Sequence, residues 1–257
     1  MRILAIGDVT SPAGIEHLEK SLWRIRGEKK IDFCVVNGEN ASFITGISPE
    51  LADRLFAAGA DVITGGNHTL RNNRIFEYIE EKNEIIRPIN FGGAVPGKGY
   101  SLVDVAGYRF LVINAMGNVH IEPTLNSPYP YIDALLDSLS GKYDFSILDI
   151  HAEATGEKAA IGYAYDGKIN VIFGTHTHVQ TADEIILPEG TGYISDVGMC
   201  GESGGVLGMD PAVVVERMRN KIAHRFIVSR GACRANGAIF EIDATKNRVT
   251  SIERITF

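Results

Sequence analysis

The chain has 257 residues, of which 45% are hydrophobic and 22% charged, a composition typical of a globular protein. Its formal net charge of −7 argues against electrostatic capture of duplex nucleic acid, and three scattered cysteines without a CxxC pair argue against a disulfide framework or a cysteine-ligated zinc site. No apolar run approaches the roughly 20 residues that cross a bilayer, and the first one ends at Asp8, too early for a secretion signal, so we predict one cytoplasmic domain over residues 1–257 without a membrane partner.

Six short apolar runs predict strands that are covered on both faces, because their apolarity is continuous rather than alternating. They are Ile3–Ile6, Phe33–Val36, Val62–Ile63, Phe110–Ile113, Phe145–Ile150 and Val171–Phe173. Between them, apolar residues at helical spacing predict helices, one of which has Ser48 as its N-cap and Pro49 as its first residue. The predicted helices are Ile15–Ile25, Pro49–Ala58, Asn73–Glu81 and Tyr131–Leu139. Strands that alternate with helices indicate α/β packing.

The C-terminal third differs, because its predicted strands are antiparallel. They are Tyr193–Ser195, Arg225–Ser229, Ala238–Ile242 and Val249–Thr256, with residues 243–247 as the last hairpin turn. We therefore expect a mixed, two-sheet, layered α/β domain. The glycine-rich segment 195–208 is either a phosphate-facing loop, whose backbone N–H groups form an anion nest, or a plain flexible connection.

The segment 174–178, Gly-Thr-His-Thr-His, carries the strongest functional signal. If it is extended, both imidazoles point to one side, with Cα atoms roughly 6.6 Å apart at about 3.3 Å per residue. That spacing suits two metal ions about 3.5–4 Å apart better than one closed site. Further candidate ligands follow other predicted strands, whose carboxyl ends gather at one edge of an α/β sheet. All the candidates are Asp8, Glu39, Asn40, Asn67, His68, His151, His176 and His178. The sequence therefore predicts a two-metal hydrolase.

Several candidates also have a purely structural interpretation. Asp8 could cap the following helix, and Glu39-Asn40 could form an ordinary turn, although a buried carboxylate is costly unless it is paired or metal-bound. His68, one position after Asn67, should point away from the ligand direction and could meet a leaving group. A lone strand-end histidine is otherwise more often a hydrogen-bonded structural residue.

Residues around His151 and three other histidines leave further alternatives. Asp149 shares the strand parity of His151 and could orient its imidazole, and Glu153 could do the same or cap the helix that begins near Thr155. His120 follows a central strand and could line the substrate pocket. The histidines expected to be surface or structural residues are His17 and His224.

Taken together, these motifs resemble the YmdB-like family of calcineurin-type metallophosphoesterases. The matching segments are Ile6–Val9, Asn37–Ala41, Gly66–Thr69, Arg87–Asn90, Asp149–Thr155, Gly174–Asp183 and Asp196–Met199. The resemblance implies a four-layer sandwich of two mixed β-sheets flanked by helices, and a dinuclear metal centre with His68 as proton donor. The ligands implied for one ion are Asp8, Glu39, Asn40 and His178. Those implied for the other are Glu39, Asn67, His151 and His176, with Glu39 bridging.

Some residues depart from the family pattern near the expected pocket. The broader superfamily usually has a histidine where this chain has Thr10, and Asn40 is expected to supply the missing ligand. Leu70-Arg71 replaces the Trp-Asp that the family tends to have, and Cys200 stands where threonine is common. None of the departures is a predicted ligand, so they bear on the substrate rather than on the metal centre.

The resemblance implies a metal-dependent phosphodiesterase that hydrolyses a 2′,3′-cyclic nucleotide of the cAMP or cGMP type, with metal-activated water as nucleophile and His68 as general acid. Mixed imidazole, carboxylate and amide ligation suits iron or manganese, with magnesium or zinc as alternatives. Two other functions stay open: a phosphomonoesterase or nucleotidase with the same centre, and a non-catalytic regulatory protein that senses a nucleotide. A homo-oligomer is plausible, but no sequence feature sets its order.

Overall fold

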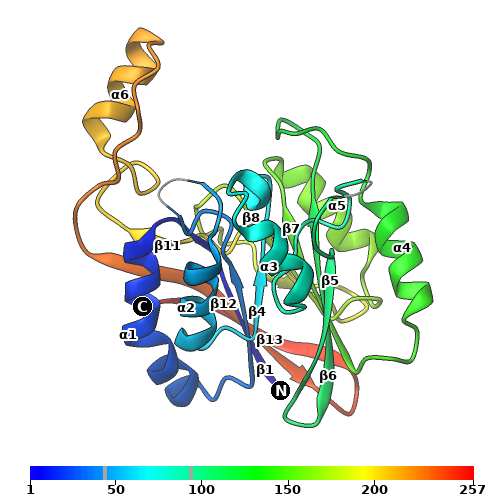
Figure 1. Cartoon of the computed structure of the whole chain (residues 1–257). Helices are drawn as coiled ribbons and strands as arrows, with labels where there is room; N and C mark the ends of the chain where they lie inside the picture. Colours follow the sequence, from blue (N-terminus) through cyan, green and yellow to red (C-terminus); the bar gives the residue numbers. More distant parts are fainter. Residues whose placement is uncertain (43–44, 93–94) are drawn as a thin grey trace.

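Two β-sheets lie between two groups of helices, which gives the chain four layers (Figure 1). The computed structural model describes residues 1–42, 45–92 and 95–257. Buried apolar residues form one cluster between the two sheets and one between each sheet and its helices. The four-layer sandwich of two mixed sheets is therefore confirmed.

The first sheet joins strands from both ends of the chain. It contains β1 (Arg2–Ile6), β2 (Asp8–Val9), β3 (Phe33–Asn37), β4 (Val62–Thr64), β11 (Met199–Glu202), β12 (Cys233–Asp243) and β13 (Arg248–Thr256). The strand order is β2-β11-β12-β1-β3-β4, and β13 pairs with β12. Strands β1, β3 and β4 run parallel, so their carboxyl ends meet at one edge. Strand β12 runs antiparallel to its three neighbours.

The second sheet comes from the middle of the chain. It contains β5 (Tyr100–Val105), β6 (Tyr108–Met116), β7 (Phe145–His151), β8 (Val171–Thr175), β9 (Ile185–Ile186) and β10 (Gly192–Ile194). The strand order is β5-β6-β7-β8-β10-β9. Strands β6, β7, β8 and β10 run parallel, and the two edge strands run antiparallel to their neighbours.

Helices cover the outer faces of both sheets (Figure 1). Those packed on the first sheet are α1 (Pro12–Lys29), α2 (Pro49–Ala58) and α3 (Ile75–Glu81), and a 3-10 turn, η1 (Thr69–Arg71), precedes α3. Those packed on the second sheet are α4 (Tyr129–Ser138) and α5 (Thr155–Ala164). Helix α6 (Pro211–Asn220) instead projects from the body as an arm, and only its Val214 is buried (Figure 1).

The elements predicted from apolar periodicity are confirmed, with small shifts at their ends. Helix α2 has the predicted bounds, and the Ser48 hydroxyl accepts a hydrogen bond from the Leu51 backbone N–H at 3.4 Å, as an N-cap should. The last two strands form the predicted antiparallel hairpin. Asp243 closes its turn by accepting hydrogen bonds from the hydroxyl and backbone N–H of Thr245.

Three predictions about the C-terminal third were wrong in part. Strand β10, expected to be antiparallel, pairs in parallel with β8. The connection between the two strands returns the chain to the end of the sheet where β8 begins. Residues 225–229 form no strand: Val228 makes a single bridge to Met209, whose neighbours turn at once into α6. The glycine-rich segment is partly strand β11, between β2 and β12, so neither a loop nor a flexible connection describes all of it.

No helix among the described residues is both long enough and apolar enough to span a membrane.

The layer between the sheets is held by aromatic contacts. Phe33 on β3 stacks on Phe110 on β6, with ring centroids 4.1 Å apart, and both side chains are fully buried. Phe110 also contacts Phe145 of the neighbouring strand at 5.5 Å. Because these rings join the two sheets, they also fix how the strand ends of one sheet face those of the other.

We expect Phe110→Ala to lower the free energy of unfolding by about 3–5 kcal/mol, because it opens a cavity between the sheets. Equilibrium urea denaturation measures the loss. Phe110→Leu, which fills much of the same volume, is the matched control and should cost clearly less. Equal losses in the two variants would show that cavity volume is not the determining term.

Candidate metal centre

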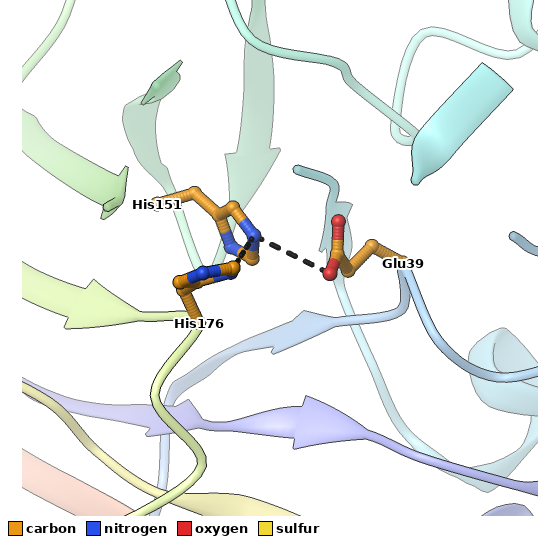
Figure 2. A group of neighbouring side chains, drawn as sticks. All are labelled: Glu39, His151 and His176. Carbon is orange, nitrogen blue, oxygen red and sulfur yellow. Dashed lines mark hydrogen bonds and ion pairs between the residues drawn. The ribbon is translucent and has the colours of Figure 1, made fainter. Parts of the chain in front are cut away.

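The predicted ligands come together where the two sheets present their strand ends. Glu39 follows β3 of the first sheet, whereas His151 ends β7 and His176 follows β8 of the second. Figure 2 shows the two imidazoles turned toward the Glu39 carboxylate. One ligand atom from each of these three residues lies within 4.8 Å of the other two. The long-range convergence that the strand-end pattern predicted is present.

Three atoms that can donate a lone pair surround Nε2 of His151, so four such groups meet at this point. This nitrogen lies 3.0 Å from Asn67 Oδ1, 3.1 Å from His176 Nδ1 and 3.3 Å from Glu39 Oε1. One proton can satisfy only one of these contacts, whereas a cation accepts lone pairs from all four groups. The donor set therefore fits a metal ion.

The other imidazole nitrogen of His151 is held by a hydroxyl. Nδ1 lies 2.9 Å from Thr175 Oγ1, which in turn donates to Asp149 Oδ1 at 2.7 Å. His151 Nδ1–H can thus donate to Thr175, which leaves Nε2 as the ring nitrogen that faces the site. Asp149 was expected to orient His151 directly; it does so through Thr175. Asp149 also accepts hydrogen bonds from Thr64 and Asn37, and burial raises its pKa to about 6.

A second group of ligand atoms surrounds Asp8. Its Oδ2 accepts a hydrogen bond from the His176 backbone N–H at 3.0 Å. Among the described residues its Oδ1 has no hydrogen-bond partner although it is buried, and it lies 3.7 Å from His178 Nε2. An orphaned buried carboxylate oxygen beside an imidazole is a costly arrangement that a bound cation would satisfy. Asp8 does not cap α1; the Ser11 hydroxyl does, by accepting from Gly14 N–H at 3.3 Å.

Asn40 turns its amide nitrogen, not its amide oxygen, toward this group of ligand atoms. Nδ2 donates to Glu39 Oε1 at 2.8 Å and lies 3.5 Å from His178 Nε2, while Oδ1 lies 2.8 Å from His68 Nδ1. Its predicted role as an oxygen ligand therefore requires the amide to turn over, which would place its NH₂ against His68. Residues 39–42 do form a turn, and the turn is what carries both side chains inward.

Both histidines of the 174–178 segment lie beyond strand β8, so the extended geometry predicted for them was wrong. The strand ends at Thr175, and the backbone then adopts positive φ at His176 (97°) and His178 (64°). Such conformations are strained for non-glycine residues and cost about 1–3 kcal/mol each. Hydrogen bonds to Asp8 and Asp196 hold the bend. The two imidazoles face the site because of this bend, not because of strand parity.

His68 was expected to point away from the ligands, and this too was wrong. Asn67 and His68 lie in a turn, so both side chains reach the site. The His68 backbone N–H donates to Glu39 Oε2 at 2.9 Å. Its ring lines a pocket of about 260 Å³ together with Glu39, Asn40 and the two histidines of the 174–178 segment. Thr10 lines the same pocket.

Burial and neighbouring charges shape the protonation of the cluster. Burial acts to raise the pKa of Glu39, but His151 and His68 hold it well below its usual range. Burial acts to lower the pKa of His151, yet the carboxylates of Glu39, Asp8 and Asp149 raise it to about 9. Burial, together with the nearby His151, lowers the pKa of His176 to about 3, so this imidazole is neutral. The carboxylates thus create a negative potential that favours a cation.

The remaining residues singled out from the sequence lie outside the cluster or at its edge. Glu153 Oε2 lies 3.2 Å from His176 Nε2, and Ala154 rather than Glu153 is the N-cap residue of α5. His17 Nε2 binds the Phe257 carbonyl at 2.9 Å, a structural role. His120 is exposed and does not line the pocket. His224 lies near Glu216, away from the site.

Lys158 is a residue that the sequence analysis missed. This α5 lysine is fully buried and donates to Asp196 Oδ2 at 2.8 Å. The same carboxylate accepts hydrogen bonds from the backbone and hydroxyl of Thr177, between the two histidines. The pair therefore fixes the bend that carries His176 and His178. Its signal in the sequence is a lysine three positions before Ile161, on the apolar face of a helix.

Comparison with known proteins shows the family and the fold of this chain. Residues 4–255 match the family described as YmdB-like protein. A 2′,3′-cyclic-nucleotide 2′-phosphodiesterase of Bacillus subtilis is 39% identical over 255 residues, which are 99% of this chain and 96% of that protein. The crystal structure of a novel phosphatase from Mycoplasma pneumoniae superimposes with a TM-score of 0.92 at 32% identity, covering 100% of this chain and 93% of that one. A Haemophilus influenzae NAD nucleotidase shares the fold, with a TM-score of 0.60 at 14% identity, and this chain covers 55% of it.

We expect Gly66→Ala to abolish metal binding while the fold is kept. A Cβ at this position would lie 2.3 Å from Glu39 Oε2 and 2.4 Å from His151 Nε2, so the two ligands must separate. Elemental analysis of the purified protein, with circular dichroism for the fold, tests this. Gly27→Ala, whose Cβ meets nothing within 4 Å, is the control. A fully metallated Gly66→Ala protein would contradict the assignment.

Removal of the Lys158 ammonium should destabilise the chain and loosen the metal site. Lys158→Met leaves the Asp196 carboxylate buried without its partner, which costs about 3–5 kcal/mol of unfolding free energy. Chemical denaturation gives the stability, and titration with Mn²⁺ gives the expected loss of affinity. Arg24→Ala removes an exposed helical ion pair as a control and should cost no more than about 0.5 kcal/mol. If Lys158→Met lost no more unfolding free energy than Arg24→Ala, the role of the Lys158–Asp196 pair would be refuted.

Proposed function

The chain belongs to the YmdB-like protein family, and on that premise we propose that it is a metal-dependent phosphodiesterase acting on 2′,3′-cyclic nucleotides. The observation that carries the proposal is the convergence of Glu39, His151 and His176 from two sheets onto one point, beside a buried carboxylate oxygen of Asp8 that has no hydrogen-bond partner within the described ranges. Paired metal ions in such a site can activate water and stabilise the attacking and leaving oxygens of a displacement at phosphorus.

Two sets of residues fit two ions that share Glu39. The set proposed for one ion is Glu39, Asn67, His151 and His176. The set proposed for the other is Asp8, Glu39, Asn40 and His178. Iron or manganese suits this mixture of imidazole, carboxylate and amide donors, with magnesium or zinc as alternatives. When bound, two such ions would make a water molecule nucleophilic near neutral pH and offset the charge that develops on the phosphoryl oxygens.

His68 is the proposed proton donor. Asn40 Oδ1 lies 2.8 Å from its Nδ1, and if the amide turns over to bind an ion through oxygen, its NH₂ group meets the same nitrogen. In either arrangement Nδ1 is engaged, and Nε2 is the nitrogen that can deliver a proton to the departing ribose oxygen. Glu39 anchors the backbone of the same residue. The proposed proton donor, His68, is therefore held by Glu39, the residue that both ions are proposed to share.

A phosphomonoesterase is the second candidate, because the similar Mycoplasma pneumoniae structure is described as a phosphatase. The ligand set does not distinguish the two, since both reactions need the same metal chemistry. Family membership makes the chain an enzyme of the phosphoesterase class, which argues against a purely regulatory nucleotide sensor.

The test is hydrolysis of 2′,3′-cyclic AMP by protein reconstituted with manganese or iron, beside metal-stripped protein. We expect His68→Ala to lower kcat by about 10²–10⁴-fold with metal content intact, and Glu39→Ala to lose both metal and activity. His120→Ala, an exposed histidine outside the pocket, should match the wild type.

Each outcome assigns a role. Loss of metal from His68→Ala would make that residue a ligand rather than the acid. A metallated and active Glu39→Ala protein would defeat the bridging role. Turnover of nucleoside monophosphates, with none of the cyclic nucleotide, would establish the phosphomonoesterase instead.

A further inference from the structure

We propose that the foot of the α6 arm supplies a nucleobase subsite to the catalytic pocket, with Phe226 as the ring on which the base stacks. The inference rests on the proposed function and names the part of the substrate that the metal centre leaves unrecognised. Seven of the nine residues that line the pocket are polar, and the two apolar ones, Met209 and Phe226, lie in the segments directly before and after α6, which form the foot of the arm.

Hydrogen bonds between the two chain segments at the foot of the arm place these side chains. The chain leaves the body before α6 and returns after it, and the segments pair through a bridge between Met209 and Val228. Asp210 N–H donates to the Ile227 carbonyl at 2.8 Å, and Ser229 N–H donates to the Gly208 carbonyl at 2.8 Å. Phe226 lies next to this pairing in the chain, so backbone contacts fix its place relative to Met209.

Arg217 fixes the Phe226 ring from the far side. Its guanidinium carbon lies 4.2 Å from the ring centroid, and its Nη1 donates to the His224 carbonyl. Phe226 lines a neighbouring apolar groove of about 440 Å³ as well as the catalytic pocket, whereas Arg217 lines the groove alone. The guanidinium therefore covers the groove side of the ring and leaves the pocket side for a ligand.

The chemistry of the two walls selects the substrate. Carboxylate and imidazole groups form one part of the wall and suit the phosphate and its metal ions, while a flat apolar ring and a thioether form a second part. A planar nucleobase matches the second wall, because every base can stack on an aromatic ring and methionine adapts to its shape. Stacking discriminates by ring area rather than by hydrogen bonding, so we expect purines to be preferred over pyrimidines without strict base selectivity.

Binding to the manganese-reconstituted protein tests the subsite without turnover. The probes are adenosine 3′-monophosphate and inorganic phosphate, measured by isothermal titration calorimetry. Phe226→Ala should weaken binding of the nucleotide by on the order of 10-fold and leave binding of phosphate unchanged. Phe226→Trp should keep or improve nucleotide binding, and Met218→Ala, on the same arm but lining only the groove, should change neither.

The outcomes separate this proposal from the proposed function. Unchanged nucleotide affinity in Phe226→Ala, or an equal loss for phosphate, would overturn the subsite. A nucleotide-specific loss rescued by Phe226→Trp would establish it, even if 2′,3′-cyclic AMP proved not to be hydrolysed and the proposed function failed. With turnover present, Phe226→Ala should raise KM for the cyclic nucleotide and leave kcat near the wild-type value.

Discussion

The burial of the Glu39 carboxylate is the constraint on which the site depends. An ionised carboxylate removed from water is costly unless surrounding groups compensate its charge and fill its lone pairs. Glu39 accepts hydrogen bonds from the His68 backbone and the Asn40 amide, and an imidazole nitrogen of His151 lies 3.3 Å away. These partners belong to three segments, which follow β3 and β4 of the first sheet or end β7 of the second, so the charge requires the sheets to be held in one relative position.

Three features of the fold hold that position. Stacked rings between the sheets, led by Phe33 and Phe110, set the distance from one sheet to the other. A glycine at position 66 lets the backbone after β4 approach Glu39 and His151 more closely than any side chain would allow. The buried Lys158–Asp196 pair holds the strained bend after β8. The side chains gathered at this edge are thus supported by residues that do not line the pocket.

The pocket combines two kinds of surface with separate origins. The polar wall is carried by the rigid strand ends of the body, which suits a reaction that needs fixed ligands and a fixed proton donor. The apolar wall is carried by an arm that few contacts tie to the body. Under the proposed nucleobase subsite, such a division would let the polar wall carry the reaction while the arm contributes to the choice of ester.

The sequence by itself determined the elements and the identity of most site residues. Apolar runs and helical spacing are local properties, and polar residues directly after buried strands, such as Glu39 and His151, could be recognised as ligand candidates without knowing how the strands pair. The capping of α2 by Ser48 was equally local, because it depends on a backbone N–H three residues away.

Only the tertiary structure decided how these pieces meet. The parallel pairing of β10 and the exposed arm of α6 depend on contacts between distant segments, which a periodic pattern does not encode. The positive φ of His176, the hydroxyl of Thr175 between Asp149 and His151, and the buried ion pair of Lys158 likewise arise only once both sheets are packed. Their common physical reason is that a buried charge or hydrogen bond is satisfied by whatever group lies nearest in space, and that group is set by the whole fold.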